Sequence, residues 1–214
     1  APFNKFLLRK FMHEQKMALP NWQVMIDDAT LDEFVSTGFM VLDNCFCKDY
    51  LLALQTESGC LDYGLAHLTA GERISEIRGD RIRWIDERCP AGMVYLSAIG
   101  ELAGFFNQTL YAGIRHWEAH YAHYPTGFGY QWHSDNPMGR DERVISAVFY
   151  LNEDWQAADG GEVLLIDKKN NLQTRAPKAN RLLVFDSNLR HQVNITHRNR
   201  FSIATWMRKD SIII

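Results

Sequence analysis

The chain has 214 residues, of which 46% are hydrophobic and 12% aromatic, and its formal net charge is −3 at pH 7. This length suffices for one domain with a substantial core, and the apolar content argues against disorder. Acidic and basic residues are interspersed, so we expect no nucleic-acid partner. No apolar run is long enough to span a bilayer, so we expect no membrane partner. The four cysteines lack zinc-ligand spacing, which favours reduced thiols and a cytoplasmic location.

The first half of the chain is predicted to be mainly helical. Residues 1–16 have an amphipathic helix pattern rather than that of a signal peptide, and we expect this helix to pack on the domain. Asp28 is placed to cap a short helix that Gly38 closes. A strand over 39–42 and a helix over 48–57 are expected next.

Residues 59–80 show no periodicity and are long for a connection, as is typical of lids and binding loops, although a plain solvated loop is the alternative. A strand over 81–85 follows. Apolar residues at helical spacing then predict a helix over 91–110.

From residue 115 onward the pattern changes to short strands separated by Gly, Pro and Asn turns. The predicted strands cover residues 117–122, 144–151, 162–166, 181–185, 191–195 and 201–207. Helices followed by strands predict an α+β fold, with helices bracing a closed β sandwich or jelly roll. We expect one domain over 1–214, in which 1–110 supply mainly helical support and a lid loop, and 115–207 form the β core.

His133 and Asp135 are separated by one residue, so on a strand their side chains point to the same face. His191 follows a distant apolar stretch, which a later strand could bring back beside them. Two imidazoles and one carboxylate on one side of a metal leave other positions open, an arrangement suited to non-haem iron(II). Taken singly, each histidine is better explained as a hydrogen-bonded core residue than as a metal ligand. Arg200, nine positions after His191, strengthens the interpretation.

This order of HxD, distant His and following Arg resembles the iron(II)- and 2-oxoglutarate-dependent dioxygenases. In that family the cosubstrate buries a carboxylate away from the metal, and a planar, two-pronged guanidinium suits it better than a lysine. Several further segments resemble the oxygen-sensing prolyl hydroxylases that act on hypoxia-inducible factor, and their bacterial relatives. These segments are 78–85, 121–125, 129–137, 150–155, Gly160-Gly161 and 200–206.

The resemblance implies a double-stranded β-helix with iron(II) held by His133, Asp135 and His191. It implies that 2-oxoglutarate and O2 are cosubstrates, that ascorbate is a candidate reductant, and that a prolyl residue in a protein loop is hydroxylated with release of succinate and CO2. The other implied roles are 2-oxoglutarate binding by Arg200 and Tyr150, contact with its chelating end by Tyr124, a pocket wall at Trp206, and substrate binding by Arg143, Arg78 and Asp80. The histidines at 67, 116, 120, 123 and 197 are interpreted as surface or packing residues.

Two departures from the animal enzymes affect the expected substrate. The stretch between Asp135 and Arg143 is slightly longer, and the chain stops soon after Trp206. The first bears on the role of Arg143, and the second favours the shorter bacterial type, for which the expected target is a proline in a protein such as elongation factor Tu. The alternatives are an oxygenase of a free amino acid or other small molecule, and a non-catalytic cupin-like binding module. Repair of alkylated nucleic acid is disfavoured by the acidic balance.

Overall fold

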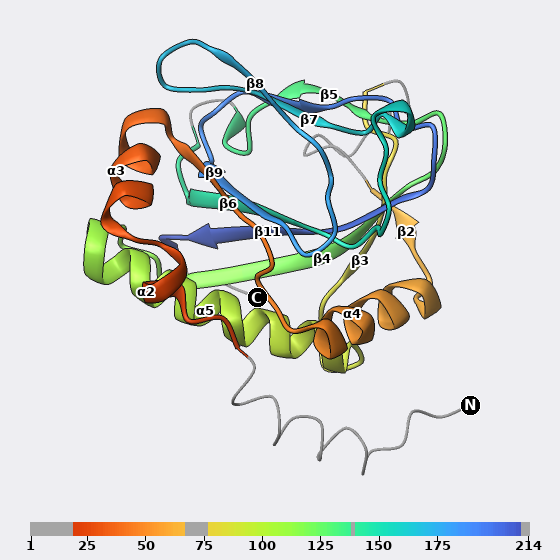
Figure 1. Cartoon of the computed structure of the whole chain (residues 1–214), viewed down its shortest axis with the longest axis horizontal. Helices are drawn as coiled ribbons and strands as arrows, with labels where there is room; N and C mark the ends of the chain where they lie inside the picture. The colour runs from red at the N-terminus through yellow and green to blue at the C-terminus, as the bar shows by residue number, and fades with distance from the viewer. Residues whose placement is uncertain (1–18, 67–76, 138–139, 211–214) are drawn as a thin grey trace.

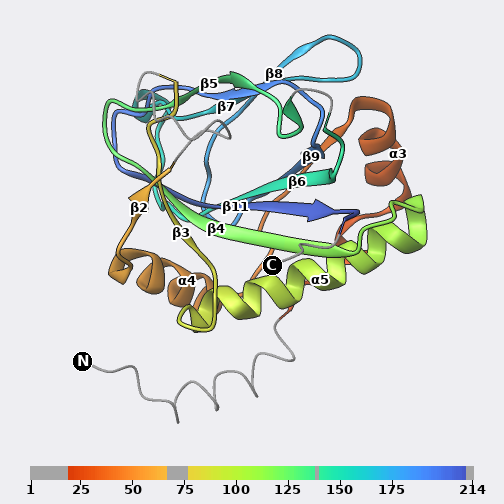
Figure 2. The ribbon, with the colours of Figure 1, turned by 180° about the vertical axis from the view of Figure 1, so that it is seen from behind.

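A computed structural model describes residues 19–66, 77–137 and 140–210. Two antiparallel β-sheets face each other, and helices lie against the outer side of the larger sheet (Figure 1). The strand orders among the described residues are β1-β9-β6-β11-β4-β3-β2 and β5-β10-β7-β8. Seen from behind, α5 runs along β4 and β11 (Figure 2).

The helices and strands have the following bounds. The helices are α2 (Trp22–Met25), α3 (Asp28–Thr37), α4 (Lys48–Cys60) and α5 (Pro90–Leu110), with a 3-10 turn η2 (Ala157–Asp159). The larger sheet contains β1 (Phe39–Leu42), β2 (Gly64–Leu65), β3 (Arg81–Trp84), β4 (His116–Tyr124), β6 (Arg143–Tyr150), β9 (Leu182–Asp186) and β11 (Arg200–Arg208). The smaller sheet contains β5 (Tyr130–His133), β7 (Val163–Ile166), β8 (Leu172–Arg175) and β10 (His191–Val193).

The central strands of the larger sheet have two different faces. On β4, Ala119 and Tyr121 pack into the core against the helices, whereas His120, Ala122 and Tyr124 face a cavity between the sheets. The same alternation holds on β6 and β11 because side chains of a strand point to opposite faces in turn. One face of these strands therefore stabilises the fold, and the other is available for a site.

The amino end of α5 is fixed to the rest of the molecule by one carboxylate. Glu57 on α4 accepts hydrogen bonds from the backbone N–H groups of Ala91 and Gly92, both at 2.8 Å, and from the Tyr121 hydroxyl at 2.7 Å. These bonds satisfy backbone donors that a helix leaves unpaired in its first turn, and they place a negative charge at the positive end of the helix dipole. They hold α4, α5 and β4 in a fixed arrangement behind the cavity.

The α+β arrangement of helices on one side of a β sandwich is confirmed, as is the strand over 39–42. The helix cap is different from the prediction, because Asp27 rather than Asp28 accepts the N–H of Thr30, at 2.8 Å. Residues 59–80 are not wholly irregular, since α4 extends to Cys60 and β2 lies within them. A two-residue strand such as β2 is too short to show a period.

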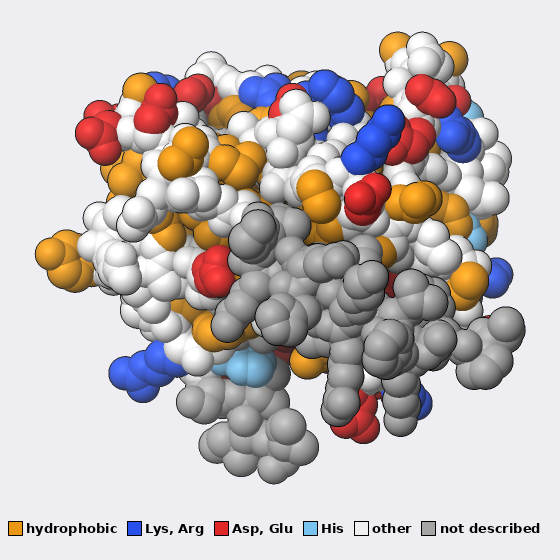
Figure 3. Space-filling view, turned by 60° about the horizontal axis from the view of Figure 1, so that its bottom comes forward, with side chains coloured by type: hydrophobic (Ala, Val, Ile, Leu, Met, Phe, Trp, Pro, Cys, Tyr) orange, Lys and Arg blue, Asp and Glu red, His pale blue; other side chains and the backbone are white. Residues whose placement is uncertain are grey.

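Strands β5 and β8 were not delimited from sequence, because four residues with mixed exposure give a weak alternation. The predicted helix over 1–16 and the centre of the predicted lid, residues 67–76, lie outside the described residues. No helix in the described part of the chain has the length and hydropathy required to cross a membrane. On the described part of the face shown in Figure 3, acidic and basic side chains are interspersed.

Candidate metal and cosubstrate site

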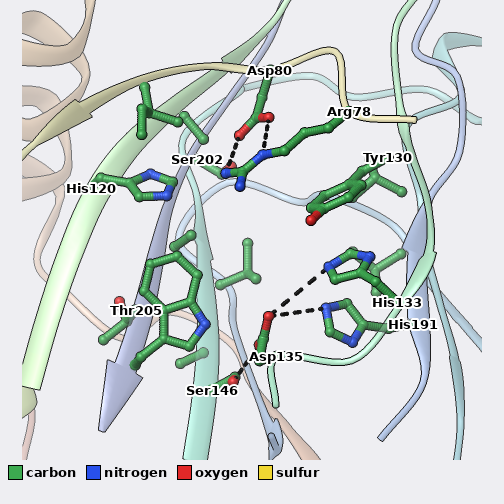
Figure 4. Close-up of a pocket in the computed structure, with 18 of the residues that line it drawn as sticks. Arg78, Asp80, His120, Tyr130, His133, Asp135, Ser146, His191, Ser202 and Thr205 are labelled. Atoms are coloured by element: carbon green, nitrogen blue, oxygen red, sulfur yellow. Dashed lines mark hydrogen bonds and ion pairs between the residues drawn. The ribbon is translucent and has the colours of Figure 1, made fainter. Parts of the chain in front are cut away.

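His133, Asp135 and His191 converge at one end of the cavity (Figure 4). One ligand atom from each residue lies within 4.8 Å of the others. Asp135 Oδ1 is 4.0 Å from His133 Nε2 and 3.9 Å from His191 Nε2. The two histidines are opposite each other in the antiparallel pairing of β5 with β10, so the backbone register itself brings them together.

The inference that His133 and Asp135 share one strand is wrong in detail. Strand β5 ends at His133, and Asp135 lies in the turn that follows. The Asp135 backbone N–H donates to the Ser187 carbonyl at 3.1 Å, which fixes the carboxylate next to the imidazoles. The convergence therefore depends on the turn as well as on strand alternation.

Each imidazole is oriented by a carbonyl two residues before it. His133 Nδ1 is 2.7 Å from the Gln131 carbonyl and His191 Nδ1 is 2.9 Å from the Leu189 carbonyl. Because a carbonyl only accepts, both Nδ1 atoms carry hydrogen, and both Nε2 lone pairs face Asp135. Such contacts behind metal-binding histidines fix the tautomer and the ring orientation.

The ionisation states of these groups also suit a cation. Burial lowers the pKa of His133 to about 3, and the neighbouring His191 contributes. Burial alone would raise the pKa of Asp135, but the two histidines and a hydrogen bond from Ser146 hold the pKa below its usual range. A neutral imidazole and an ionised carboxylate are the forms that coordinate a metal.

Arg200 lies fully buried, with 1% of its surface exposed. Its Nε donates to the Gly161 carbonyl at 3.0 Å and its Nη1 to Ser202 Oγ at 3.2 Å. Among the described residues, Arg200 Nη2 and the Tyr150 hydroxyl are buried without a hydrogen-bond partner. A buried guanidinium needs a paired anion, so these two donors fit the carboxylate of a bound molecule.

The backbone at position 161 lies so close to the Arg200 side chain that only glycine fits there. Gly161 has φ +68°, a conformation that other residues rarely adopt, and an added Cβ would lie 3.0 Å from Arg200 Cδ. The guanidinium carbon lies 5.0 Å from the ring of Tyr124 and 5.2 Å from that of Tyr150. The two rings and the Gly160-Gly161 turn therefore hold the guanidinium in one place.

The cavity between the sheets has a volume of about 790 Å³. All the predicted site residues line it except Tyr150, which lies behind the wall beside Arg200. Arg143 at the start of β6 lies over the ring of Trp206, with its guanidinium carbon 4.1 Å from the ring centre. Arg78 and Asp80 form an ion pair at 2.7 Å on another part of the wall. The structure thus brings the predicted residues together; their individual roles remain predictions.

Sequence reasoning missed three residues of this site. Ser146 on β6 donates to Asp135 Oδ2 at 2.5 Å. Tyr130 stacks on the His133 ring at 3.6 Å. His120, interpreted as a surface or packing residue, is packed but also lines the cavity. The signal for His120 was its place two strand periods from Tyr124, which puts both on one face of β4.

The fold and the site together define a class of protein. Residues 119–208 match the model of the 2OG-Fe(II) oxygenase superfamily. That segment contains all three candidate metal ligands and Arg200, and the two facing sheets are the double-stranded β-helix of this class.

More specific relatives are prolyl hydroxylases. The chain is 34% identical over 186 residues to human prolyl hydroxylase EGLN3, covering 79% of this chain and 77% of EGLN3. It is 36% identical to human Egl nine homolog 1 but spans only 43% of that protein. A solved Pseudomonas putida prolyl-4-hydroxylase superposes with a TM-score of 0.77 at 33% identity, over 85% of this chain and 98% of that one. A Trichoplax adhaerens prolyl hydroxylase bound to a hypoxia-inducible factor peptide fragment gives 0.79 at 26% identity, over 97% and 94% of the chains.

The chain belongs to the prolyl hydroxylase-like branch of the iron(II)/2-oxoglutarate oxygenases. It is accordingly an iron- and 2-oxoglutarate-dependent dioxygenase, with Fe²⁺, 2-oxoglutarate and O2 as the cofactor and cosubstrates of its family. The His133, Asp135 and His191 set and the unpaired donors of Arg200 and Tyr150 suit this requirement by their chemistry.

Proposed function

We propose that this enzyme hydroxylates a prolyl residue in a loop of a protein, with 2-oxoglutarate and O2 converted to succinate and CO2. The supporting observation is the open His-Asp-His set beside a buried arginine that has an unpaired donor, in a chain similar to prolyl hydroxylases. We place iron(II) at His133, Asp135 and His191. When bound there, the metal supplies the oxidative decarboxylation that yields one hydroxylated carbon per molecule of keto acid consumed.

The protein's own groups would orient the reactants. Arg200 and the Tyr150 hydroxyl would grip the remote carboxylate of 2-oxoglutarate, and Tyr124 would contact its other end. With both rings packed around the guanidinium, water is kept from the clamp, which strengthens a charge-assisted hydrogen bond. The keto acid would then reach the metal set with one orientation.

The proposed substrate is a peptide segment rather than a small metabolite. Arg143, Trp206, Arg78 and Asp80 give the cavity a wall of charged and aromatic groups outside the metal set. One similar enzyme, that of Trichoplax, is bound to a peptide in its solved structure. The resemblance to bacterial enzymes suggests a proline-bearing loop of a translation elongation factor as the target. Four free thiols are consistent with work in a reducing compartment, which we propose is the cytoplasm.

The test is turnover of the purified chain with iron(II), 2-oxoglutarate and O2. A panel of prolyl peptides, including elongation-factor loops, is compared with free proline and other free amino acids. We expect succinate to form together with a mass gain of one oxygen on a peptide proline. His191→Ala should abolish both products. Turnover of a free amino acid alone would instead establish the small-molecule alternative. If none of the tested compounds led to succinate formation, the proposal would be refuted.

A further inference from the structure

His120 lies on the cavity wall and has a buried ring nitrogen that no described residue satisfies. The side chain is 1% exposed and lies on β4. Its Nδ1 is 3.2 Å from the Tyr121 carbonyl, whereas Nε2 has no hydrogen-bond partner among the described residues. Figure 4 shows the ring on the cavity wall near Asp80, across the space from His133 and His191. Buried polar atoms are normally paired, so this one requires an explanation.

The cosubstrate does not explain it. Of the buried, unpaired side-chain atoms in the described part of the chain, Arg200 Nη2 and the Tyr150 hydroxyl lie at the anion clamp, and His120 Nε2 is the third. Arg200 pairs with Tyr124 across β11 and β4, and His120 lies four residues before Tyr124 on the same face. At the rise of a strand, this separation is about 13 Å. A short keto acid that extends from Arg200 to the metal ligands has no part at His120.

The chemistry of the missing partner follows from the ring. Because the Tyr121 carbonyl only accepts, Nδ1 carries the hydrogen and Nε2 is an acceptor. Burial lowers the pKa of His120 to about 4, so the ring is neutral at pH 7. The rings of Trp84 and Trp206, at 5.0 Å and 5.1 Å, hold it in place. The partner must therefore bring an N–H or O–H donor to a fixed point on the wall.

A prolyl residue cannot supply that donor from its own backbone, since its nitrogen carries no hydrogen. The residues on either side of it can. We propose that His120 Nε2 accepts a hydrogen bond from a backbone N–H beside the target proline, which makes His120 a residue that selects a peptide over other prolyl compounds. This inference rests on the proposed function, because it assumes that a prolyl peptide enters the cavity.

The test uses probes that do not depend on knowing the target. The full chain is loaded with zinc(II) in place of iron(II) and with 2-oxoglutarate, and dissociation constants are measured by NMR titration. The probes are N-acetyl-Ala-Pro-N-methylamide and its two variants, in which either the alanine nitrogen or the terminal amide nitrogen carries an additional methyl group. Each added methyl removes one donor next to the proline.

The variants isolate the acceptor. His120→Phe keeps a ring without an acceptor, His120→Leu replaces it if the larger ring is not tolerated, and His120→Gln restores an acceptor. His123→Phe is the matched control, because His123 lies on the same strand but on the opposite face, stacked on Phe201 at 4.5 Å. Thermal melting of each variant confirms that it is folded.

We expect one of the two added methyl groups to weaken binding to the wild type about 10-fold, the effect of leaving one buried acceptor unpaired. His120→Phe should bind the parent probe about 10-fold more weakly and should be insensitive to that methyl group. His120→Gln and His123→Phe should remain sensitive. Equal binding of the parent probe by the wild type and His120→Phe, or equal methyl effects in both, would overturn the inference. Failure of every probe to bind the wild type would refute the prolyl site itself, and this inference with it.

Discussion

Removal of the Ser146 hydroxyl should weaken metal binding although Ser146 is not a ligand. Its Oγ is 2.5 Å from Asp135 Oδ2 and 2.8 Å from Ser187 Oγ. A carboxylate only accepts, so Ser146 donates to Asp135 and Ser187 in turn donates to Ser146. This chain holds Oδ2 on the side away from the histidines and leaves Oδ1 toward them.

The size of the effect can be worked out from this geometry. A buried hydrogen bond to a charged group is worth about 1.5–3 kcal/mol, and Ser146 is 1% exposed. Ser146→Ala should therefore lower the affinity for a divalent metal by about 10- to 100-fold, the usual range for groups that orient a ligand. Ser146→Thr, which keeps the hydroxyl, should recover most of the affinity.

Manganese(II) binding followed by EPR measures the affinity without turnover. Ser134→Ala is the matched control, since Ser134 is next to Asp135 in the chain but its hydroxyl contacts the Asn136 carbonyl, at 3.3 Å. That variant should bind manganese(II) as the wild type does. An unchanged affinity in Ser146→Ala, or an equal loss in Ser134→Ala, would show that the serine pair does not orient the carboxylate.

Three other outcomes follow from the site. Arg200→Ala should raise the KM for 2-oxoglutarate by two orders of magnitude or more, because breaking a buried charge pair costs about 3–5 kcal/mol. Tyr150→Phe should raise the same KM only about 10-fold, because it removes a single hydrogen bond. Steady-state kinetics at saturating iron measures both values, and equal effects would contradict the roles given to Arg200 and Tyr150 in binding the carboxylate. Urea titrations should show the unfolding free energy falling between pH 6.5 and 4, and His120 should contribute about 3 kcal/mol of this fall, because burial lowers its pKa from 6.5 to about 4 and only the unfolded chain takes up that proton in this window. His120→Gln should remove this part of the pH dependence, and an unchanged slope would refute a neutral buried ring. Asp80→Asn should destabilise the fold by about 3 kcal/mol in the same titrations, since it removes the buried carboxylate that forms the ion pair with Arg78 at 2.7 Å, and a loss below 1 kcal/mol would show that the pair is dispensable.

The charged residues and the candidate metal ligands were the predictable part of this site. His133, Asp135, His191 and Arg200 were identified because their types and order have few uses other than a metal and an anion. The long periodic helix α5 was likewise clear from spacing.

What sequence could not supply was the partner of each group. Ser146 reaches Asp135 only because β6 pairs with β11 and β9, an arrangement that no local pattern encodes. His120 appeared as one more histidine in an alternating strand, and its unpaired nitrogen became visible only once both neighbouring strands were placed. Short strands such as β2 and β8 were missed because two to four residues cannot establish a period.

Because His191 pairs directly with His133, a metal bound by both would cross-link two strands that are distant in the chain. The pairing of β5 with β10 is short and its register shifts after His191, so few backbone hydrogen bonds hold it. A ligand that binds only the paired arrangement stabilises it by mass action. The availability of iron would then affect the stability of the smaller sheet as well as the activity of the enzyme. Hydrogen exchange at β5 and β10 should slow when metal is added.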